Sequence, residues 1–355
     1  MTVSVTNKTR HSPPIVRSLD VLADRNLIGD DGVETLRSVT RDLPFAITQH
    51  LLSLIDPNDP RDPIALQFIP DRRETDTLPE ERNDPIGDAP FSPLKGVVHR
   101  YPDRILLKPL MTCPAHCRFC FRRDRVGGKD KAMTDRDIQA ALKYIKEHAE
   151  IWEVILSGGD PLMMPAGSLG FLVSELAAIE HVAVVRIHSR LPVTDPSRIT
   201  AALIGALHRD DIAVYLAIHC NHAREISLET RAVCARLSRA GIPLLGQTVL
   251  LRGVNDTPEA MEELLRAMVR NRIKPYYLHH ADLARGTAHF RTEIAEGQAL
   301  MRALRGRLSG VCLPSYVLDI PGGAGKSPLT LSHWDEEEKT IEDWHGKKHA
   351  YPPFL

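Results

Sequence analysis

The sequence lacks the features that would tie it to a membrane or to nucleic acid. It contains no apolar run of roughly 18 or more residues, the length needed to span a bilayer. The N-terminal stretch MTVSVTNKTRHSPP has no apolar signal-peptide core. The formal net charge is -1, so no excess of one sign favours nucleic acid or an anionic membrane as a partner. These absences predict a cytoplasmic protein that binds neither.

Cysteine is scarce and unevenly placed. The 355-residue chain has six cysteines, and three of them lie in one short run, Cys113–Cys120. Small secreted proteins spread their cysteines as a disulfide frame, so this distribution argues against such a fold. We expect the scattered Cys220, Cys234 and Cys312 to be buried free thiols. The length suffices for one large domain or two ordinary ones.

The N-terminal part divides into a helical region and a proline-rich stretch. Residues 18–28 and 32–55 have helix-like apolar spacing. Residues 56–93 are rich in Pro, Asp and Arg and cannot form a continuous helix. We interpret this stretch as an extended arm that wraps a core or a partner subunit, so a homo-oligomer, most simply a dimer, is expected. The alternative is a disordered linker.

From residue 100 to 320 a strand followed by a helix recurs about every 30 residues, the size of a βα unit. The expected strands are short, apolar and rich in Val, Ile and Leu, as in a parallel sheet buried on both faces. They span 105–111, 154–156, 183–187, 213–218, 244–250, 275–278 and 313–318. The pattern predicts an α/β fold with a partial (β/α)6-type parallel barrel. The expected divisions are 1–95 (helices and arm), 96–320 (barrel) and 321–355 (C-terminal segment).

Chemically unusual residues follow the expected strands, where parallel barrels gather their active sites. In chain order they are Cys113, Ser157–Asp160, His188–Arg190, His219–His222, Asp282 and Asp319. His188, His219, His222, His279 and His280 would also fit a metal-dependent hydrolase. Hydrogen bonding around cofactors is the interpretation we favour for these histidines.

The cysteine run reads Cys113-Pro-Ala-His-Cys117-Arg-Phe-Cys120. Three thiolates in one short loop suit an iron–sulfur cluster, and a four-iron cluster would keep one iron open to a non-protein ligand. A zinc site is the first alternative. It needs four ligands, and His116 directly precedes Cys117, so both rarely reach one tetrahedral metal. Three unligated thiols are the second alternative.

A glycine-rich stretch, PGGAGKSP at 321–328, contains one lysine, Lys326. It does not match the phosphate-binding pattern G-x4-G-K-[ST], because Ile320 stands where the first glycine belongs. Lysine in such a loop suits a Schiff base with pyridoxal phosphate. The alternative is a solvated lysine in a turn.

The pattern C-x3-C-x-aromatic-C after the first strand of a partial barrel resembles the radical S-adenosylmethionine superfamily. The resemblance implies a [4Fe–4S] cluster on Cys113, Cys117 and Cys120, with S-adenosylmethionine on the open iron. It also implies that Ser157, Gly158, Gly159 and Asp160 bind S-adenosylmethionine. A Gly-Gly-Asp turn alone is weak evidence, because such turns occur in many proteins.

The cysteine run and the late lysine together resemble the lysine 2,3-aminomutase family over roughly residues 60–330. Further segments match in order. They are HRYPDR (99–104), LSGGDPL (156–162), RIHSR (186–190), QTVLLRGVND (247–256), PYY (275–277) and HFRT (289–292).

The family resemblance implies a conversion of L-lysine to β-lysine by migration of the α-nitrogen, started by a 5′-deoxyadenosyl radical. Lys326 and Arg100 would bind pyridoxal phosphate, and Arg122 would bind the substrate carboxylate. Asp282 and Asp319 would hold the distant ammonium of lysine, since a buried ammonium needs carboxylate partners. Alternatively, Arg122 is a solvated arginine and the two acids are loop acids. An electron donor such as flavodoxin or ferredoxin is implied.

The chain departs from the longer aminomutases, which carry a C-terminal zinc site. Thr257 replaces one of their cysteines, and no cysteine follows Cys312, so this zinc site is not expected. Phe121 resembles the shorter branch that makes β-lysine for elongation factor P, whereas 321–328 resembles the longer one. The chain is therefore a short form between the two branches. The alternatives are the same chemistry on another amino acid, β-lysine supply for elongation factor P, and a cluster protein that binds partners without turnover.

Overall fold

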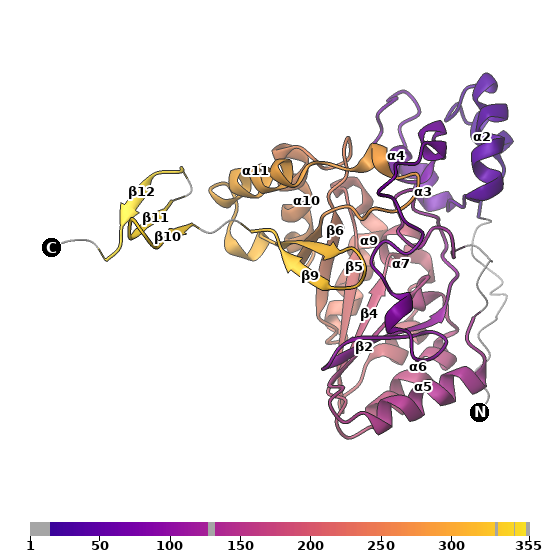
Figure 1. Cartoon of the computed structure of the whole chain (residues 1–355). Helices are drawn as coiled ribbons and strands as arrows, with labels where there is room; N and C mark the ends of the chain where they lie inside the picture. Colours follow the sequence, from indigo (N-terminus) through magenta and orange to yellow (C-terminus); the bar gives the residue numbers. More distant parts are fainter. Residues whose placement is uncertain (1–14, 127–131, 331–332, 344, 353–355) are drawn as a thin grey trace.

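The structure, a computed structural model, describes residues 15–126, 132–330, 333–343 and 345–352. Its centre is a nine-stranded sheet in the order β1 to β9 (Figure 1). Strands β2 to β8 run parallel, while β1 and β9 are antiparallel edge strands. The strands are β1 (Val97–Tyr101), β2 (Arg104–Leu110), β3 (Glu153–Gly158), β4 (Val184–Ser189), β5 (Ala213–His219), β6 (Leu244–Val249), β7 (Ile273–His279), β8 (Ser315–Ile320) and β9 (Gly325–Pro328). The prediction of a partial parallel barrel is confirmed.

Helices between the strands pack against the sheet and enclose the main core. They are α5 (Asp135–Glu147), α6 (Ala166–Ala177), α7 (Leu191–Thr194), α8 (Ala201–Leu207), α9 (Leu228–Arg239), α10 (Pro258–Arg270) and α11 (Ile294–Arg305). Helix α5 begins with a capping box, in which Thr134 and Asp137 exchange side-chain and backbone hydrogen bonds. Its apolar stripe of Ile138, Leu142 and Ile145 is buried, as the spacing predicts.

The N-terminal region forms a second core beside the barrel mouth. Its helices are α1 (Leu19–Ala23), α2 (Asp30–Asp42), α3 (Gln49–Leu54) and α4 (Ala65–Phe68). The expected helix over 32–55 is wrong in one respect, because α2 ends at Asp42, just before Leu43 and Pro44. Proline disfavours helical backbone in the residue before it. This second core also contains Ala115 of the cysteine run, so the N-terminal helices support that loop.

The proline-rich arm contains short helical turns, η1 (Arg72–Thr75) and η2 (Ala89–Phe91), instead of one continuous helix. It lies against the barrel of the same chain. Glu74 is buried between Arg118 and Arg123, and Gly87 packs on the backbone of Gly322. The arm therefore forms one wall of the barrel mouth.

Two C-terminal features were not foreseen. The glycine-rich stretch ends in strand β9, which places Lys326 opposite Asp319 of β8. Beyond it, β10 (Trp334–Asp335), β11 (Thr340–Glu342) and β12 (Lys348–Ala350) form a small sheet that stands apart from the barrel (Figure 1).

Two further expectations concern cysteines and membranes. Cys220, Cys234 and Cys312 are buried free thiols, as predicted. Within the described residues, the helices are too short or too polar to cross a membrane.

Candidate active site

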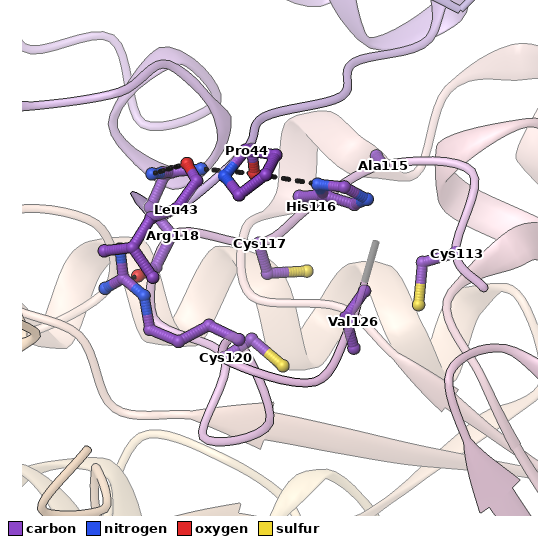
Figure 2. Close-up of a pocket in the computed structure, with 10 residues that line it drawn as sticks. Leu43, Pro44, Cys113, Ala115, His116, Cys117, Arg118, Cys120 and Val126 are labelled. Atoms are coloured by element: carbon purple, nitrogen blue, oxygen red, sulfur yellow. Dashed lines mark hydrogen bonds between the residues drawn. The ribbon is translucent and has the colours of Figure 1, made fainter. Parts of the chain in front are cut away.

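The cysteine run leaves the end of β2 and surrounds a cavity of about 350 Å³, which includes its opening to solvent. Figure 2 shows the sulfurs of Cys113, Cys117 and Cys120 around this space. The loop is fixed to the N-terminal region, because the His116 N–H donates to Ala46 O at 2.8 Å and the Arg118 N–H to Gln67 O at 2.9 Å. Three soft donors around one open space fit an iron–sulfur cluster.

The structure gives little support to the zinc alternative. His116 lines the cavity, but its Nδ1 makes a 2.9 Å hydrogen bond with the carbonyl of Pro44 (Figure 2). Among the described residues, no three His, Cys, Asp or Glu side chains converge closely enough to hold a single metal ion. Thiolates that bind one cuboidal cluster sit on different irons and need not converge in this way.

Burial keeps two of the thiols protonated in the absence of metal. Burial, followed by the charge of Asp160, raises the pKa of Cys113 well above its usual range. Burial and the neighbouring Cys117 raise the pKa of Cys120 to about 11. A metal must therefore displace protons when it binds, and the loop has the protected, apolar character of a ligand site.

The turn Ser157–Asp160 follows β3 and packs against the start of the cysteine run. Gly158 has a φ of 107°, and a Cβ on Gly159 would overlap the backbone of Thr112. Only glycine therefore allows this turn to pack directly against the backbone at the end of β2 and the start of the cysteine run.

Asp160 has a different task from its neighbours in the turn. Its buried carboxylate accepts the Ser189 hydroxyl and the N–H groups of Arg190 and Leu191, each at 2.8 Å. Burial raises the pKa of Asp160 although these hydrogen bonds lower it. This carboxylate joins the ends of β3 and β4 and thereby holds the turn in place.

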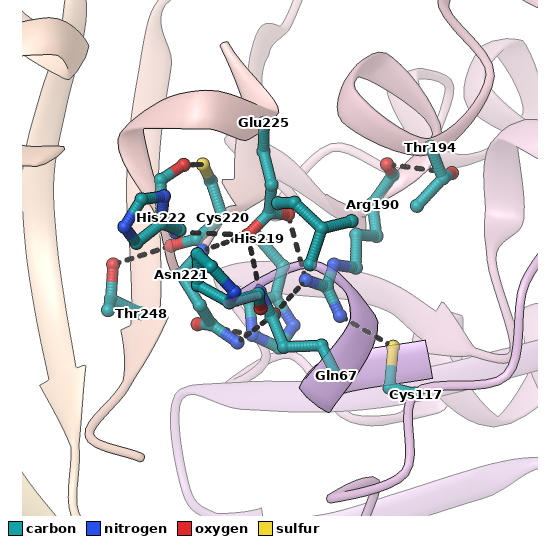
Figure 3. A network of polar contacts seen from close by, with 12 residues as sticks. Gln67, Cys117, Arg190, Thr194, His219, Cys220, Asn221, His222, Glu225 and Thr248 are labelled. Atoms are coloured by element: carbon teal, nitrogen blue, oxygen red, sulfur yellow. Dashed lines mark hydrogen bonds and ion pairs between the residues drawn. The ribbon is translucent and has the colours of Figure 1, made fainter. Parts of the chain in front are cut away.

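Arg190, which the sequence analysis did not assign to the site, contacts the cysteine run directly. Its Nη1 donates to the Cys117 sulfur at 2.8 Å, and its Nη2 donates to Glu225 at 2.8 Å. Figure 3 shows the guanidinium between Cys117 on one side and Glu225 with Gln67 on the other. The guanidinium therefore places a fixed positive charge and a hydrogen-bond donor at this sulfur. The only sequence signal was its place after an expected strand.

Lys326 lies on edge strand β9, and its side chain reaches toward β8 and β7 at the mouth. Its Nζ forms an ion pair with Asp319 and lies 3.4 Å from His279 Nδ1 and 5.4 Å from the Tyr277 ring centre. The Lys326 N–H donates to Tyr101 Oη at 2.7 Å, which fixes the backbone of the lysine on β1. The lysine is therefore held by several partners and is not a solvated turn residue.

Asp282 follows β7 and lies half-buried near this lysine. Burial, and then the charge of Asp319, raises the pKa of Asp282 to about 7. Asp319 behaves in the opposite way. Burial alone would raise the pKa of Asp319, but His279 and Lys326 hold it well below the usual range. The two acids thus form a pair in which one is ionised and the other titrates near neutral pH.

The two predicted arginines meet at a residue that the sequence analysis missed. Arg122 Nη2 lies 3.0 Å and Arg100 Nη2 lies 3.1 Å from the buried carboxylate of Asp88, and Lys108 Nζ lies 3.4 Å from it. Arg122 also stacks over Phe121 at 4.3 Å. Three cations around one carboxylate leave positive charge for anions, so the residues present fit a phosphate group and a carboxylate.

Three of the histidines near the strand ends form hydrogen bonds with other side chains. His219 contacts Asn221 at 3.1 Å, His280 contacts Tyr316 at 2.8 Å, and His188 contacts Gln247 at 3.4 Å. Burial lowers the pKa of His188 and His219 well below the usual range, so both are neutral at pH 7. These contacts favour the hydrogen-bonding interpretation over a hydrolase metal site.

Comparison with known proteins agrees with this geometry. Residues 107–268 match the Radical SAM superfamily. The chain is 42% identical to L-lysine 2,3-aminomutase of Clostridium subterminale, over 83% of this chain and 71% of that protein. It is 35% identical to L-lysine 2,3-aminomutase of Escherichia coli, over 89% and 90%, and 36% identical to glutamate 2,3-aminomutase of Clostridioides difficile, over 88% and 75%. The chain belongs to the lysine 2,3-aminomutase family of radical S-adenosylmethionine enzymes.

Proposed function

We propose that this enzyme converts L-lysine to β-lysine with a [4Fe–4S] cluster, S-adenosylmethionine and pyridoxal phosphate. When bound, these groups supply the radical that starts the reaction and the electron sink that lets nitrogen migrate. The observation that carries the proposal is the arrangement of charge at one barrel mouth. An acid pair, Asp282 and Asp319, lies beside Lys326, and Arg122 is near enough to influence the pKa of Asp282.

Arg122 suits the α-carboxylate of an amino acid. Asp88 occupies its Nη2, and the buried Nε has no hydrogen-bond partner among the described residues. Stacking on Phe121 restricts the guanidinium plane. A planar fork held in one orientation can bind a carboxylate through two parallel hydrogen bonds.

The acid pair suits the distant ammonium of lysine. Asp319 pairs with a primary ammonium within the chain, that of Lys326. If Lys326 joins pyridoxal phosphate, it leaves Asp319 available for the substrate. A glutamate side chain would meet like charge here, which disfavours its binding. The acid pair therefore supports lysine over the substrate named for the glutamate-specific relative.

The remaining residues prepare the cofactor sites. Cys113, Cys117 and Cys120 would hold the cluster, and Arg190 would donate a hydrogen bond to the Cys117 sulfur. Ser157, Gly158 and Gly159 would let S-adenosylmethionine approach the backbone of the turn, which Asp160 keeps in place. Arg100 would bind the phosphate of pyridoxal phosphate, since its buried Nε has no partner among the described residues.

Anaerobic reconstitution tests the proposal. Reduced protein with iron, sulfide, S-adenosylmethionine, pyridoxal phosphate and L-lysine should form β-lysine, measured by chromatography of the derivatised amino acids. Lys326→Ala should abolish both the visible absorbance of lysine-bound pyridoxal phosphate and the product. A surface variant, Asp211→Asn, keeps the site intact and serves as the control, because exposed Asp211 pairs only with Arg209 among its described ion-pair partners.

Two results would contradict the proposal. If 5′-deoxyadenosine forms and another amino acid rearranges while lysine is unchanged, the substrate assignment is wrong. If Cys120→Ala keeps full activity, the cluster assignment is wrong. The use of β-lysine for elongation factor P, a flavodoxin or ferredoxin donor, a cytoplasmic location and a homo-oligomer stay predictions.

A further inference from the structure

Asp88 lies on the arm, outside the barrel, yet its carboxylate is 7% exposed and contacts three cations from separate elements. Arg100 comes from β1, Lys108 from β2, and Arg122 from the segment after the cysteine run. Burial alone would raise the pKa of Asp88, but Arg122 and Lys108 hold it below the usual range. Asp88 is therefore an ionised carboxylate that forms ion pairs with both predicted arginines.

The side chain of Asp88 does not support its own turn. It precedes η2, but it makes no capping hydrogen bond there. Asp84 performs that local task instead, since its carboxylate accepts the N–H of Asp88 at 2.9 Å and that of Ala89 at 2.8 Å. The Asp88 carboxylate is thus available to the cations alone, and replacing it should leave the turn intact.

The charges around Asp88 do not balance. Three cations face one carboxylate, so the cluster carries two more positive than negative charges. Within the described residues, the buried Nε atoms of Arg100 and Arg122 have no hydrogen-bond partner. Buried cations need anionic partners to offset lost hydration. The excess positive charge of the cluster suits anionic groups such as a carboxylate or a phosphate.

The arm also fixes Asp88 against the lysine-bearing segment. Gly87 has a φ of 66°, and a Cβ there would overlap Gly322 and Gly323. On the other side, Arg100 Nη2 donates to the Ile86 carbonyl at 2.8 Å. The position of Asp88 is therefore set by contacts on both sides of its short segment.

We propose that Asp88 is a positioning residue that orients Arg122 and Arg100 toward their two anions and prevents stray anions from entering between them. This inference rests on the proposed function, in which those anions are the substrate carboxylate and the cofactor phosphate. Asp88 supplies a permanent negative charge at the point where the three cations are closest. Without it, the cations repel one another and attract any available anion.

The test compares Asp88→Asn with the wild type and with Asp211→Asn. Asparagine keeps the shape and removes the charge. We expect the KM for lysine to rise about tenfold, with a smaller change in kcat, because the hydrogen bond from Arg122 loses its charged acceptor. We also expect inorganic phosphate to become an inhibitor at about tenfold lower concentration. Asp88→Glu keeps the charge and should retain the phosphate resistance of the wild type.

A double variant separates charge from orientation. Asp88→Asn with Lys108→Met removes one charge of each sign, so phosphate resistance should return while the KM for lysine stays high. If circular dichroism shows that the single variant does not fold, the KM for lysine and the phosphate inhibition are measured on the double variant instead. Unchanged KM and unchanged phosphate inhibition in a folded variant would overturn the proposal. A loss of kcat alone would also overturn it.

A binding measurement keeps this test distinct from that of the proposed function. Lysine can be titrated into protein loaded with pyridoxal phosphate, without S-adenosylmethionine or reductant, and followed by visible absorbance. If the wild type binds lysine but never forms β-lysine, the function is wrong. The role of Asp88 is tested separately by the same titration. A tenfold loss of lysine affinity in Asp88→Asn supports that role, and an unchanged affinity contradicts it.

Discussion

Asp282 is expected to control the affinity for lysine between about pH 6 and pH 8. Its pKa is raised to about 7 by burial and by Asp319. A carboxyl with this pKa is about one-tenth ionised at pH 6 and about nine-tenths ionised at pH 8. Only the ionised form attracts an ammonium, so the affinity for lysine should increase by about tenfold as the pH rises across this range.

The neighbouring groups do not produce the same effect. The pKa of Asp319 is held low by His279 and Lys326, so this acid is ionised throughout the range. Burial lowers the pKa of His279, so this ring stays neutral. The affinity for lysine is therefore expected to rise with pH, because Asp282 alone among these three groups loses its proton in this range.

The assay compares two amino acids that differ only at the distant end. Lysine and norleucine are titrated into protein loaded with pyridoxal phosphate, and the ratio of their dissociation constants is measured at each pH. The ratio removes the titration of the α-amine, which both ligands share. Asp282→Asn should show a flat ratio and bind lysine at pH 8 as weakly as the wild type does at pH 6. A flat ratio in the wild type, or a tenfold change that survives in Asp282→Asn, would refute the reasoning.

Three further outcomes follow from single contacts. Gly87→Ala should destabilise the protein by about 1–3 kcal/mol in thermal unfolding and lower its content of pyridoxal phosphate, because the added Cβ overlaps the lysine-bearing segment; Gly32→Ala, which meets open space, should do neither. Arg190→Lys should lower the cluster potential by about 50 mV in a redox titration followed by paramagnetic resonance, since a hydrogen bond to Cys117 is lost. Cys120→Ala should retain less than half of the iron after reconstitution; full iron content would exclude this thiol as a ligand.

The sequence was sufficient for the parallel strands and for the cysteine run, because both are local patterns. Apolar runs of the length of β2 to β8 are fixed by residues next to one another in the chain. Strands β1 and β9 were not predicted, because strands at the edge of a sheet have few consecutive apolar residues in their sequence. The helix predicted over 32–55 is interrupted after Asp42, because the apolar spacing continues across Pro44 although the helical backbone does not.

The charge cluster could not be predicted, since it depends on contacts between distant segments. Asp88 lies 12, 20 and 34 residues from Arg100, Lys108 and Arg122 in the chain. In the sequence it is one of many acids in an acidic, proline-rich stretch. Arg190 is similar, because its partners Glu225 and Gln67 carry no motif. Only the fold brings such groups together.

The meeting of the two sheet edges at the barrel mouth has a consequence for how tightly radical formation and rearrangement are coupled. Cys113 follows β2, near one edge, and Lys326 lies on β9, the other edge, so the two sites face each other only because the sheet curves. The hydrogen bond from the Lys326 N–H to Tyr101 joins the edges at the mouth. Each strand pair adds a rotation of roughly 20–25°, and small changes accumulate around the barrel. Core substitutions far from the mouth should therefore uncouple the reaction, seen as 5′-deoxyadenosine released in excess over rearranged amino acid.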